Sequence, residues 1–178
     1  AGAAGSAPAS GGLDAATALA SLRREVGACD RCRLAASRRQ AVLGSGDPQA
    51  GIMFVGEAPG EEEDLQGEPF VGAAGQLLTR IIAAMKLRRE QVYICNVVKC
   101  RPPGNRVPEE DEMTQCAPFL RRQIALVRPR VICALGRTAA QALLNTGDPV
   151  GRLRGATHQF EGIPVVCTYH PAALLRRP

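Results

Sequence analysis

The sequence of 178 residues contains no tryptophan, and aromatic residues make up only 3% of it. An aromatic side chain within a polar motif therefore stands out in this chain. No apolar run reaches the roughly eighteen residues that a membrane-spanning helix needs, and the basic start and apolar core of a secretory signal peptide are missing. The seven cysteines are an odd number, which argues against a secreted disulfide framework. We therefore expect a reducing, cytoplasmic environment and no contact with membranes.

Four of the cysteines form two separated pairs. Cys29 and Cys32 stand in Cys-Asp-Arg-Cys, and Cys100 and Cys116 follow much later in the chain. Thiolates that converge on one point bind either zinc or an iron–sulfur cluster, and the cysteines alone leave both alternatives open. The remaining cysteines stand in apolar runs, and we expect them to be free thiols in the core: Cys95, Cys133 and Cys167.

The net charge of +5 and the isoelectric point near 9.0 suit a polyanionic partner. Acidic residues gather in 57–68 and 109–112, whereas arginines gather in 121–122, 128–137, 152–154 and 176–177. This distribution indicates a catalytic pocket inside a phosphate-binding surface, and a solvated surface of mixed charge is the simpler alternative.

Periodicity predicts an α/β fold. Apolar runs predict strands at 51–56, 92–98 and 131–135, and 153–168 reads as a hairpin that turns near Glu161 and Gly162. Amphipathic spacing predicts helices at 13–27, 73–86, 109–127 and 137–145, and 57–70 reads as a polar loop. We predict a three-layer α/β/α sandwich around a central, mostly parallel sheet of four strands. Residues 1–12 are expected to be a disordered linker or the remnant of a tag, and 13–178 a single domain.

Three unusual segments follow the predicted strands: 56–70, 96–106 and 170–176. Ligands of such sheets bind beyond the carboxyl ends of the strands, so we expect these segments to form one site. The first segment is rich in carboxylates and lacks the Lys-Ser/Thr of a phosphate-binding P-loop. Asn96 in the second segment offers both an acceptor and a donor to the edge of a nucleobase.

Taken in order, the motifs resemble those of the family 4 uracil-DNA glycosylases, the iron–sulfur branch of the uracil-DNA glycosylase superfamily. The resemblance spans Cys29 to Arg176. It rests on Cys-x-x-Cys, Gly-Glu-Ala-Pro-Gly with Pro-Phe-Val-Gly, Asn-Val-Val-Lys-Cys-Arg-Pro-Pro, and His-Pro. It implies base excision repair, in which uracil is flipped out of DNA and its N-glycosidic bond is hydrolysed, leaving an abasic site. It also implies a structural [4Fe–4S] cluster on Cys29, Cys32, Cys100 and Cys116.

The resemblance assigns roles within the pocket. His170 would donate a hydrogen bond to uracil O2 and stabilise the leaving anion. Phe70 would stack on the flipped base, Asn96 would read the edge of uracil, and the backbone at Gly56 would approach the base closely. A carboxylate near the sugar would stabilise its positive charge. Because the Asp of family 1 enzymes is replaced by Ala58, we favour Glu57 for this role and then Asp64 of the Glu63–Asp64 pair.

The resemblance also implies a DNA-binding surface. Leu174 and Leu175 would fill the gap left by the flipped base, and Arg101, Arg106 and Arg176 would contact phosphates. The implied partner is uracil-containing DNA, single- or double-stranded, bound by a monomer. The implied location is a cytoplasm of prokaryotic type, with the enzyme on the nucleoid during repair.

Two alternatives remain at this stage. One is a related protein that traps itself covalently on uracil-containing DNA through a His after the Cys-Arg-Pro-Pro region. The residues in that region here are Gly104 to Pro108, and none is His, which favours turnover. The other is a non-enzymatic, zinc-stabilised module that binds nucleic acid.

Overall fold

The computed structural model describes residues 11–177. The predicted linker at 1–12 lies outside the described residues except for Gly11 and Gly12, which belong to helix α1 (Gly11–Gly27). Among the described residues, no helix is both long and apolar enough to cross a membrane.

The described chain folds around one sheet of six strands in the order β1-β3-β2-β4-β6-β5. Its central strands run parallel and correspond to the four predicted strands: β3 (Tyr93–Asn96), β2 (Ile52–Gly56), β4 (Val131–Leu135) and β6 (Ile163–Thr168). Two antiparallel edge strands extend them, β1 (Ser45–Gly46) and β5 (Thr157–Phe160). The α/β class and the mostly parallel sheet are confirmed, whereas β1 was not predicted.

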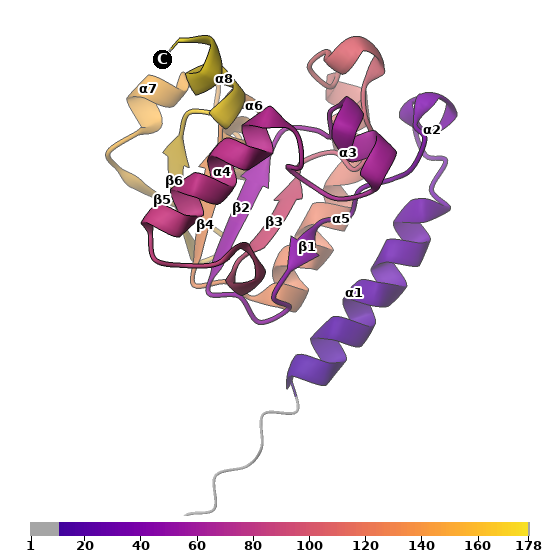
Figure 1. Cartoon of the computed structure of the whole chain (residues 1–178), viewed down its shortest axis with the longest axis horizontal. Coiled ribbons are helices and arrows are strands. Elements are labelled where there is room, and N and C mark those ends of the chain that lie inside the picture. Colours follow the sequence, from indigo (N-terminus) through magenta and orange to yellow (C-terminus); the bar gives the residue numbers. More distant parts are fainter. Residues whose placement is uncertain (1–10, 178) are drawn as a thin grey trace, which may run out of the picture.

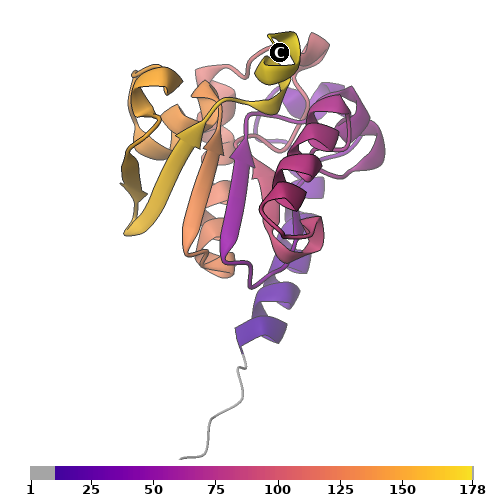
Figure 2. The ribbon, with the colours of Figure 1, turned by 60° about the vertical axis from the view of Figure 1, so that its left-hand side comes forward.

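Alternate residues of each strand pack into separate cores on the two faces of the sheet. Met53 and Val55 of β2 pack with α1, with α5 (Glu110–Val127) and with α6 (Arg137–Leu144). Phe54, between them, packs with Leu78 and Ile82 of α4 (Ala73–Ala84) on the opposite face. Figures 1 and 2 show α4 on one face of the sheet and α5 on the other. The layers are therefore those of a three-layer sandwich.

The predicted hairpin is present but begins later than expected. Residues 150–153 form the short helix α7 (Val150–Leu153), and the first arm is β5. Glu161 and Gly162 have φ values of 48° and 84°, which is typical of the tight turns that join antiparallel strands.

The segment 57–70 is not wholly a loop, because α3 (Glu61–Gln66) lies within it. Gly60 donates its N–H to Glu63 Oε2 at 3.0 Å, and the acidic residues stand at the positive end of the helix dipole. The remaining helical elements are short: α2 (Leu34–Ser37), η1 (Arg89–Gln91), η2 (Pro103–Asn105) and α8 (Pro171–Arg176).

Candidate active site and cysteine cavity

A pocket of about 680 Å³ opens at the carboxyl ends of the parallel strands. The three segments predicted to converge all contribute to its wall, and α8 packs beside α4 at this end of the sheet (Figure 1). The lining residues lie within 57–63, 70–74, 96–107, 135–137 and 170–176. The parallel topology therefore brings segments far apart in sequence to one site.

His170 stands in this pocket as the N-cap of α8. Its Nδ1 accepts a hydrogen bond from the Ala172 N–H at 3.1 Å, so the ring proton is assigned to Nε2. Burial, together with the nearby charge of Arg176 and against the opposing effect of Glu63, lowers the pKa of His170 to about 4. The imidazole is therefore neutral at neutral pH and carries a donor at Nε2.

Phe70 is buried and its ring stacks on that of His170, with the centroids 5.5 Å apart and the planes at 28°. Its φ of 52° is unusual for a residue with a bulky side chain. The surrounding structure holds this conformation, because Arg89 donates to Phe70 O at 2.8 Å and to Pro69 O. Glu63 Oε1 accepts from the next two backbone N–H groups, each at 2.9 Å. The ring is thus fixed by its backbone as well as by packing.

Asn96, at the end of β3, has a side chain that is 1% exposed. Its Oδ1 is buried and accepts no hydrogen bond from the described residues, and such an atom costs free energy unless a ligand pairs with it. A Cβ on Gly56 would lie 2.5 Å from this oxygen and 2.5 Å from the Phe70 ring. The glycine therefore keeps the floor of the pocket open beside Asn96.

Of the two candidate carboxylates, only Glu57 lines the pocket. Its Oε2 accepts from the hydroxyl of Thr138, a buried residue in the first turn of α6. Asp64 instead is buried elsewhere, and its Oδ1 accepts from the Arg39 N–H at 2.9 Å. The structure therefore does not bring Asp64 to the pocket, and its neighbour Glu63 lies on the pocket wall in its place.

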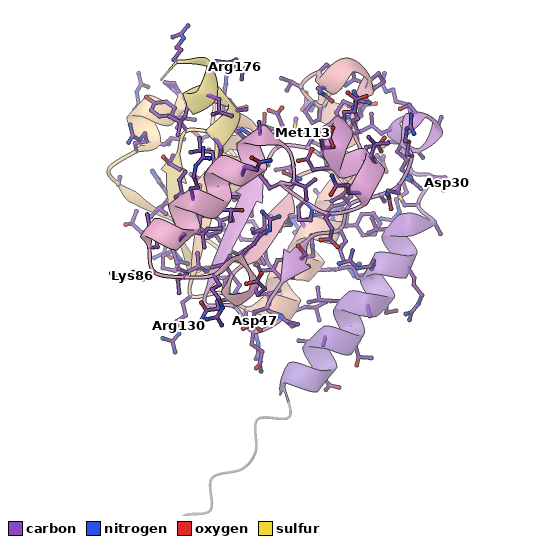
Figure 3. All side chains as sticks on the ribbon, in the orientation of Figure 1. Asp30, Asp47, Lys86, Met113, Arg130 and Arg176 are labelled. Atoms are coloured by element: carbon purple, nitrogen blue, oxygen red, sulfur yellow. The ribbon has the colours of Figure 1, made fainter. Side chains whose placement is uncertain are left out.

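The residues predicted to contact DNA lie either on α8 or in the 96–106 segment. Leu175 and Arg176 line the pocket, and Leu174 and Leu175 are 39% and 45% exposed on α8. Arg176 lies at the outer rim of this end of the molecule (Figure 3). Arg101 and Arg106 have protein partners.

Arg101 Nε donates to Asn105 Oδ1 at 2.6 Å. Arg106 lines the pocket, but its two terminal nitrogens donate to both oxygens of the buried Glu112 at 2.9 and 2.7 Å. Its positive charge is therefore largely compensated, which weakens its case as a phosphate contact.

The four paired cysteines line a second, separate cavity between the end of α1, α2 and α5: Cys29, Cys32, Cys100 and Cys116. Cys100 Sγ accepts from Arg38 Nη1 at 3.2 Å, and Cys116 Sγ accepts from the Lys99 N–H at 3.3 Å. Burial raises the pKa of the Cys116 thiol to about 11. Soft thiol ligands that face one cavity, with donors aimed at two of the sulfurs, fit a bound iron–sulfur group.

All seven cysteines lie in the described part of the chain, and each is a free thiol. Cys95 and Cys167 are buried as expected, whereas Cys133 is only partly buried. Within residues 11–177, no three His, Cys, Asp or Glu side chains are grouped in a way that would hold a single metal ion.

The residues whose hydrogen bonds fix the pocket side chains and backbone in place were not identified from the sequence. Thr138 and Arg89 carry no local signal, because their partners are distant in the chain. Glu63 had one, because a Glu three residues after the N-cap Gly60 is typical of a capping box.

The site is thus built for a flat, polar ring, with a stacked aromatic wall, a neutral donor and a buried acceptor. The model of the uracil DNA glycosylase superfamily matches residues 43–178. The type-4 uracil-DNA glycosylase of Archaeoglobus fulgidus is 48% identical over 163 residues, which cover 87% of this chain and 82% of the relative.

The type-4 enzyme of Sulfurisphaera tokodaii is 48% identical over 90% of this chain and 77% of its own length. The type-5 enzyme of Pyrobaculum aerophilum is only 33% identical, over 72% of this chain and 64% of its own length. The chain therefore belongs to the uracil DNA glycosylase superfamily and, within it, to the type-4 enzymes.

Proposed function

We propose that the chain is a uracil-DNA glycosylase, which flips uracil out of DNA and hydrolyses its N-glycosidic bond to leave an abasic site. The observation that carries this proposal is the buried, unpaired Oδ1 of Asn96 beside the stacked rings of Phe70 and His170. The names of the type-4 relatives agree with it.

Asn96 is proposed to select uracil. Its Oδ1 would accept from uracil N3–H, and its amide group would donate to O4. Cytosine presents the opposite pattern on this edge, because its N3 is an acceptor and its C4 carries an amino donor. Cytosine would therefore leave buried polar groups unpaired, which penalises its binding strongly.

His170 and Glu57 are proposed to act on the charges that develop during cleavage. Negative charge appears on the departing uracil, where the Nε2–H of a neutral His170 would donate to O2. Positive charge appears on the sugar, where the carboxylate of Glu57, oriented by Thr138, would stabilise it and orient the attacking water. Phe70 would cover the base and exclude other water.

The DNA is proposed to lie across the mouth of the pocket. Leu174 and Leu175 are exposed on α8 and would enter the base stack from which uracil has left. Arg176 would contact a phosphate, so we expect binding to weaken as salt increases. We keep Arg101 as a further phosphate contact and place Arg106 second to it, because Arg106 is paired with Glu112.

The four paired cysteines are proposed to hold a [4Fe–4S] cluster. When bound, the group would supply four iron–thiolate bonds that join the end of α1 to the 100–116 segment, and it would have no role in substrate coordination. Brown visible absorbance with matched iron and sulfide would support this assignment. A colourless protein with stoichiometric zinc would refute it in favour of the zinc alternative.

A single-turnover assay tests the function. An oligonucleotide with one uracil, single-stranded or paired, is incubated with excess protein, treated with alkali and resolved on a denaturing gel. We expect cleavage at uracil and none in the matched cytosine oligonucleotide. A band shifted by the mass of the protein would show covalent trapping, and an intact strand would refute the proposal. Sedimentation of the free protein tests the expected monomer.

A further inference from the structure

The chain has two lysines, and one of them, Lys99, is completely buried. Its ammonium donates to the backbone carbonyl of Asn96 at 2.6 Å. Among the described residues, no carboxylate lies within ion-pair distance of this ammonium. A buried charge without a counter-charge is costly, so its placement calls for a physical reason.

Lys99 lies between the two sites. Lys99 lines the cysteine cavity, and its backbone N–H donates to Cys116 Sγ at 3.3 Å. Its Nζ reaches in the other direction to Asn96, whose side chain lies on the wall of the pocket. Lys99 therefore contacts the cysteine cavity through its backbone and the residue at the end of β3 through its ammonium.

The carbonyl that Lys99 holds belongs to the residue whose side chain lies on the wall of the pocket. Asn96 pairs with Gly56 at the end of β3, and Val97 N–H still donates to Gly56 O at 2.9 Å. The Asn96 carbonyl is held by the ammonium instead. Without the ammonium this carbonyl would lose its donor, and the backbone that carries the Asn96 side chain would lose one of the contacts that fix it at the end of β3.

We propose that Lys99 is a positioning residue for uracil recognition, whose ammonium fixes the backbone of Asn96 while its own backbone N–H holds Cys116 of the cysteine cavity. This inference rests on the proposed function. It connects the cysteine cavity to the pocket through one residue, because Lys99 makes a hydrogen bond to a residue of each.

The test uses Lys99→Met, which keeps the length of the side chain but removes its charge and its donor. Lys86→Met is the matched control, because Lys86 is exposed and lies away from α8 and Arg176, near the opposite end of the sheet (Figure 3). Two oligonucleotides serve as probes. One carries a non-hydrolysable 2′-fluoro-deoxyuridine, and the other carries a tetrahydrofuran abasic analogue. The iron content of each protein is measured beside its two affinities.

We expect Lys99→Met to weaken binding of the uracil analogue about tenfold or more, because a hydrogen bond from a charged donor is lost. Binding of the abasic analogue, which has no base for Asn96 to read, should not change. In an Asn96→Ala background, Lys99→Met should add no further loss, since the two residues act through one contact. Lys86→Met should behave as wild type.

Two results would overturn the inference: an unchanged ratio of the two affinities in Lys99→Met, whether neither falls or both fall equally, or additive losses in the double variant. If Lys99→Met does not fold, Lys99→Arg replaces it, because a guanidinium keeps the charge but not the single-point geometry. We then expect a lower ratio with the iron retained, and an unchanged ratio overturns the inference. A wild-type protein that does not prefer the uracil analogue to matched thymidine would instead refute the proposed function itself.

Discussion

Replacement of His170 by Asn tests the proposed stabilisation of the leaving uracil. In the native chain Nδ1 accepts the Ala172 N–H, and Nε2 is left as the donor. Asn is a good N-cap residue, so its side-chain oxygen can keep the hydrogen bond to Ala172 while the donor at Nε2 disappears. The variant therefore separates the proposed catalytic role from the structural one.

The expected loss follows from the protonation state. Because burial lowers the pKa of His170 to about 4, only about one imidazole in 10³ is charged at pH 7. The donor is therefore neutral, and loss of one such donor in an oxyanion site typically costs about 10²–10³ in rate, or roughly 2.7–4 kcal/mol. We expect His170→Asn to show this loss in the single-turnover rate constant, with little change in affinity for the uracil analogue.

The control is His170→Ala, which removes both the donor and the cap. It should lose a similar factor in rate and, in addition, about 1 kcal/mol in the free energy of unfolding measured with urea. A wild-type rate in His170→Asn would refute the donor role. A second refutation is available from pH. The native rate should show no His170 titration between about pH 5 and 8, so a rate step near the ordinary pKa of histidine that is lost in the variant would contradict a neutral donor.

Three further predictions concern the residues that hold the site. Arg89→Met should lower the free energy of unfolding by about 1.5–3 kcal/mol in urea titrations, because the carbonyl of Phe70 loses a charged donor. An unchanged urea midpoint and an unchanged single-turnover rate would show that the backbone of Phe70 needs no such support. Glu57→Gln keeps an acceptor for Thr138 but loses the charge, and its single-turnover rate should fall about 10²-fold, whereas equal rates would remove Glu57 from the mechanism. Cys116→Ala should lose iron by elemental analysis, and wild-type iron content would exclude Cys116 as a ligand.

The position of the pocket could be predicted from sequence because it follows from topology alone. Apolar runs locate the parallel strands, and their carboxyl ends meet at one edge whatever the details of packing. Asn96 is the last residue of β3 and His170 follows shortly after β6, so their arrival at the pocket requires only that the strands form. The cysteine pairs needed one more fact, the packing of α1 against α5.

The choice between adjacent carboxylates could not be predicted, because it depends on a helix that was read as a loop. Successive side chains on a helix point about 100° apart. In α3 this rotation directs Glu63 to the N–H groups of Val71 and Gly72 and directs Asp64 away, to the N–H of Arg39. Apart from the spacing of Glu63 from Gly60, the sequence presents the two acids alike, and only the formation of the helix shows that they point to different partners.

The arginines show a second limit of prediction from sequence, because a sequence does not say whether a charged side chain is paired with an opposite charge. The acidic residues at 109–112 were read as the start of a helix, which is correct. Glu112, however, is also completely buried and accepts both terminal nitrogens of Arg106. An arginine in such a fork cannot turn to a phosphate without breaking both of its hydrogen bonds to a buried carboxylate, which would keep its 3.3 Å ion pair with Arg33. Arg176, whose Nε donates only to a backbone carbonyl, keeps its charge available.

The segment from Asn96 to Cys100 joins the residue proposed to read the base to a proposed ligand of the cluster. This connection along the backbone is more direct than a cross-link between distant helices would be. All five residues are buried, and four residue steps of extended chain span at most about 14 Å. β3 restrains the first residue of this segment, and an iron–thiolate bond at Cys100 would restrain the last. The hydrogen bond from Lys99 to the Asn96 carbonyl closes a turn between them. The orientation of the Asn96 amide would therefore depend both on β3 and on the ligand bond at Cys100. This dependence would explain why a cluster with a purely structural role lies beside the pocket.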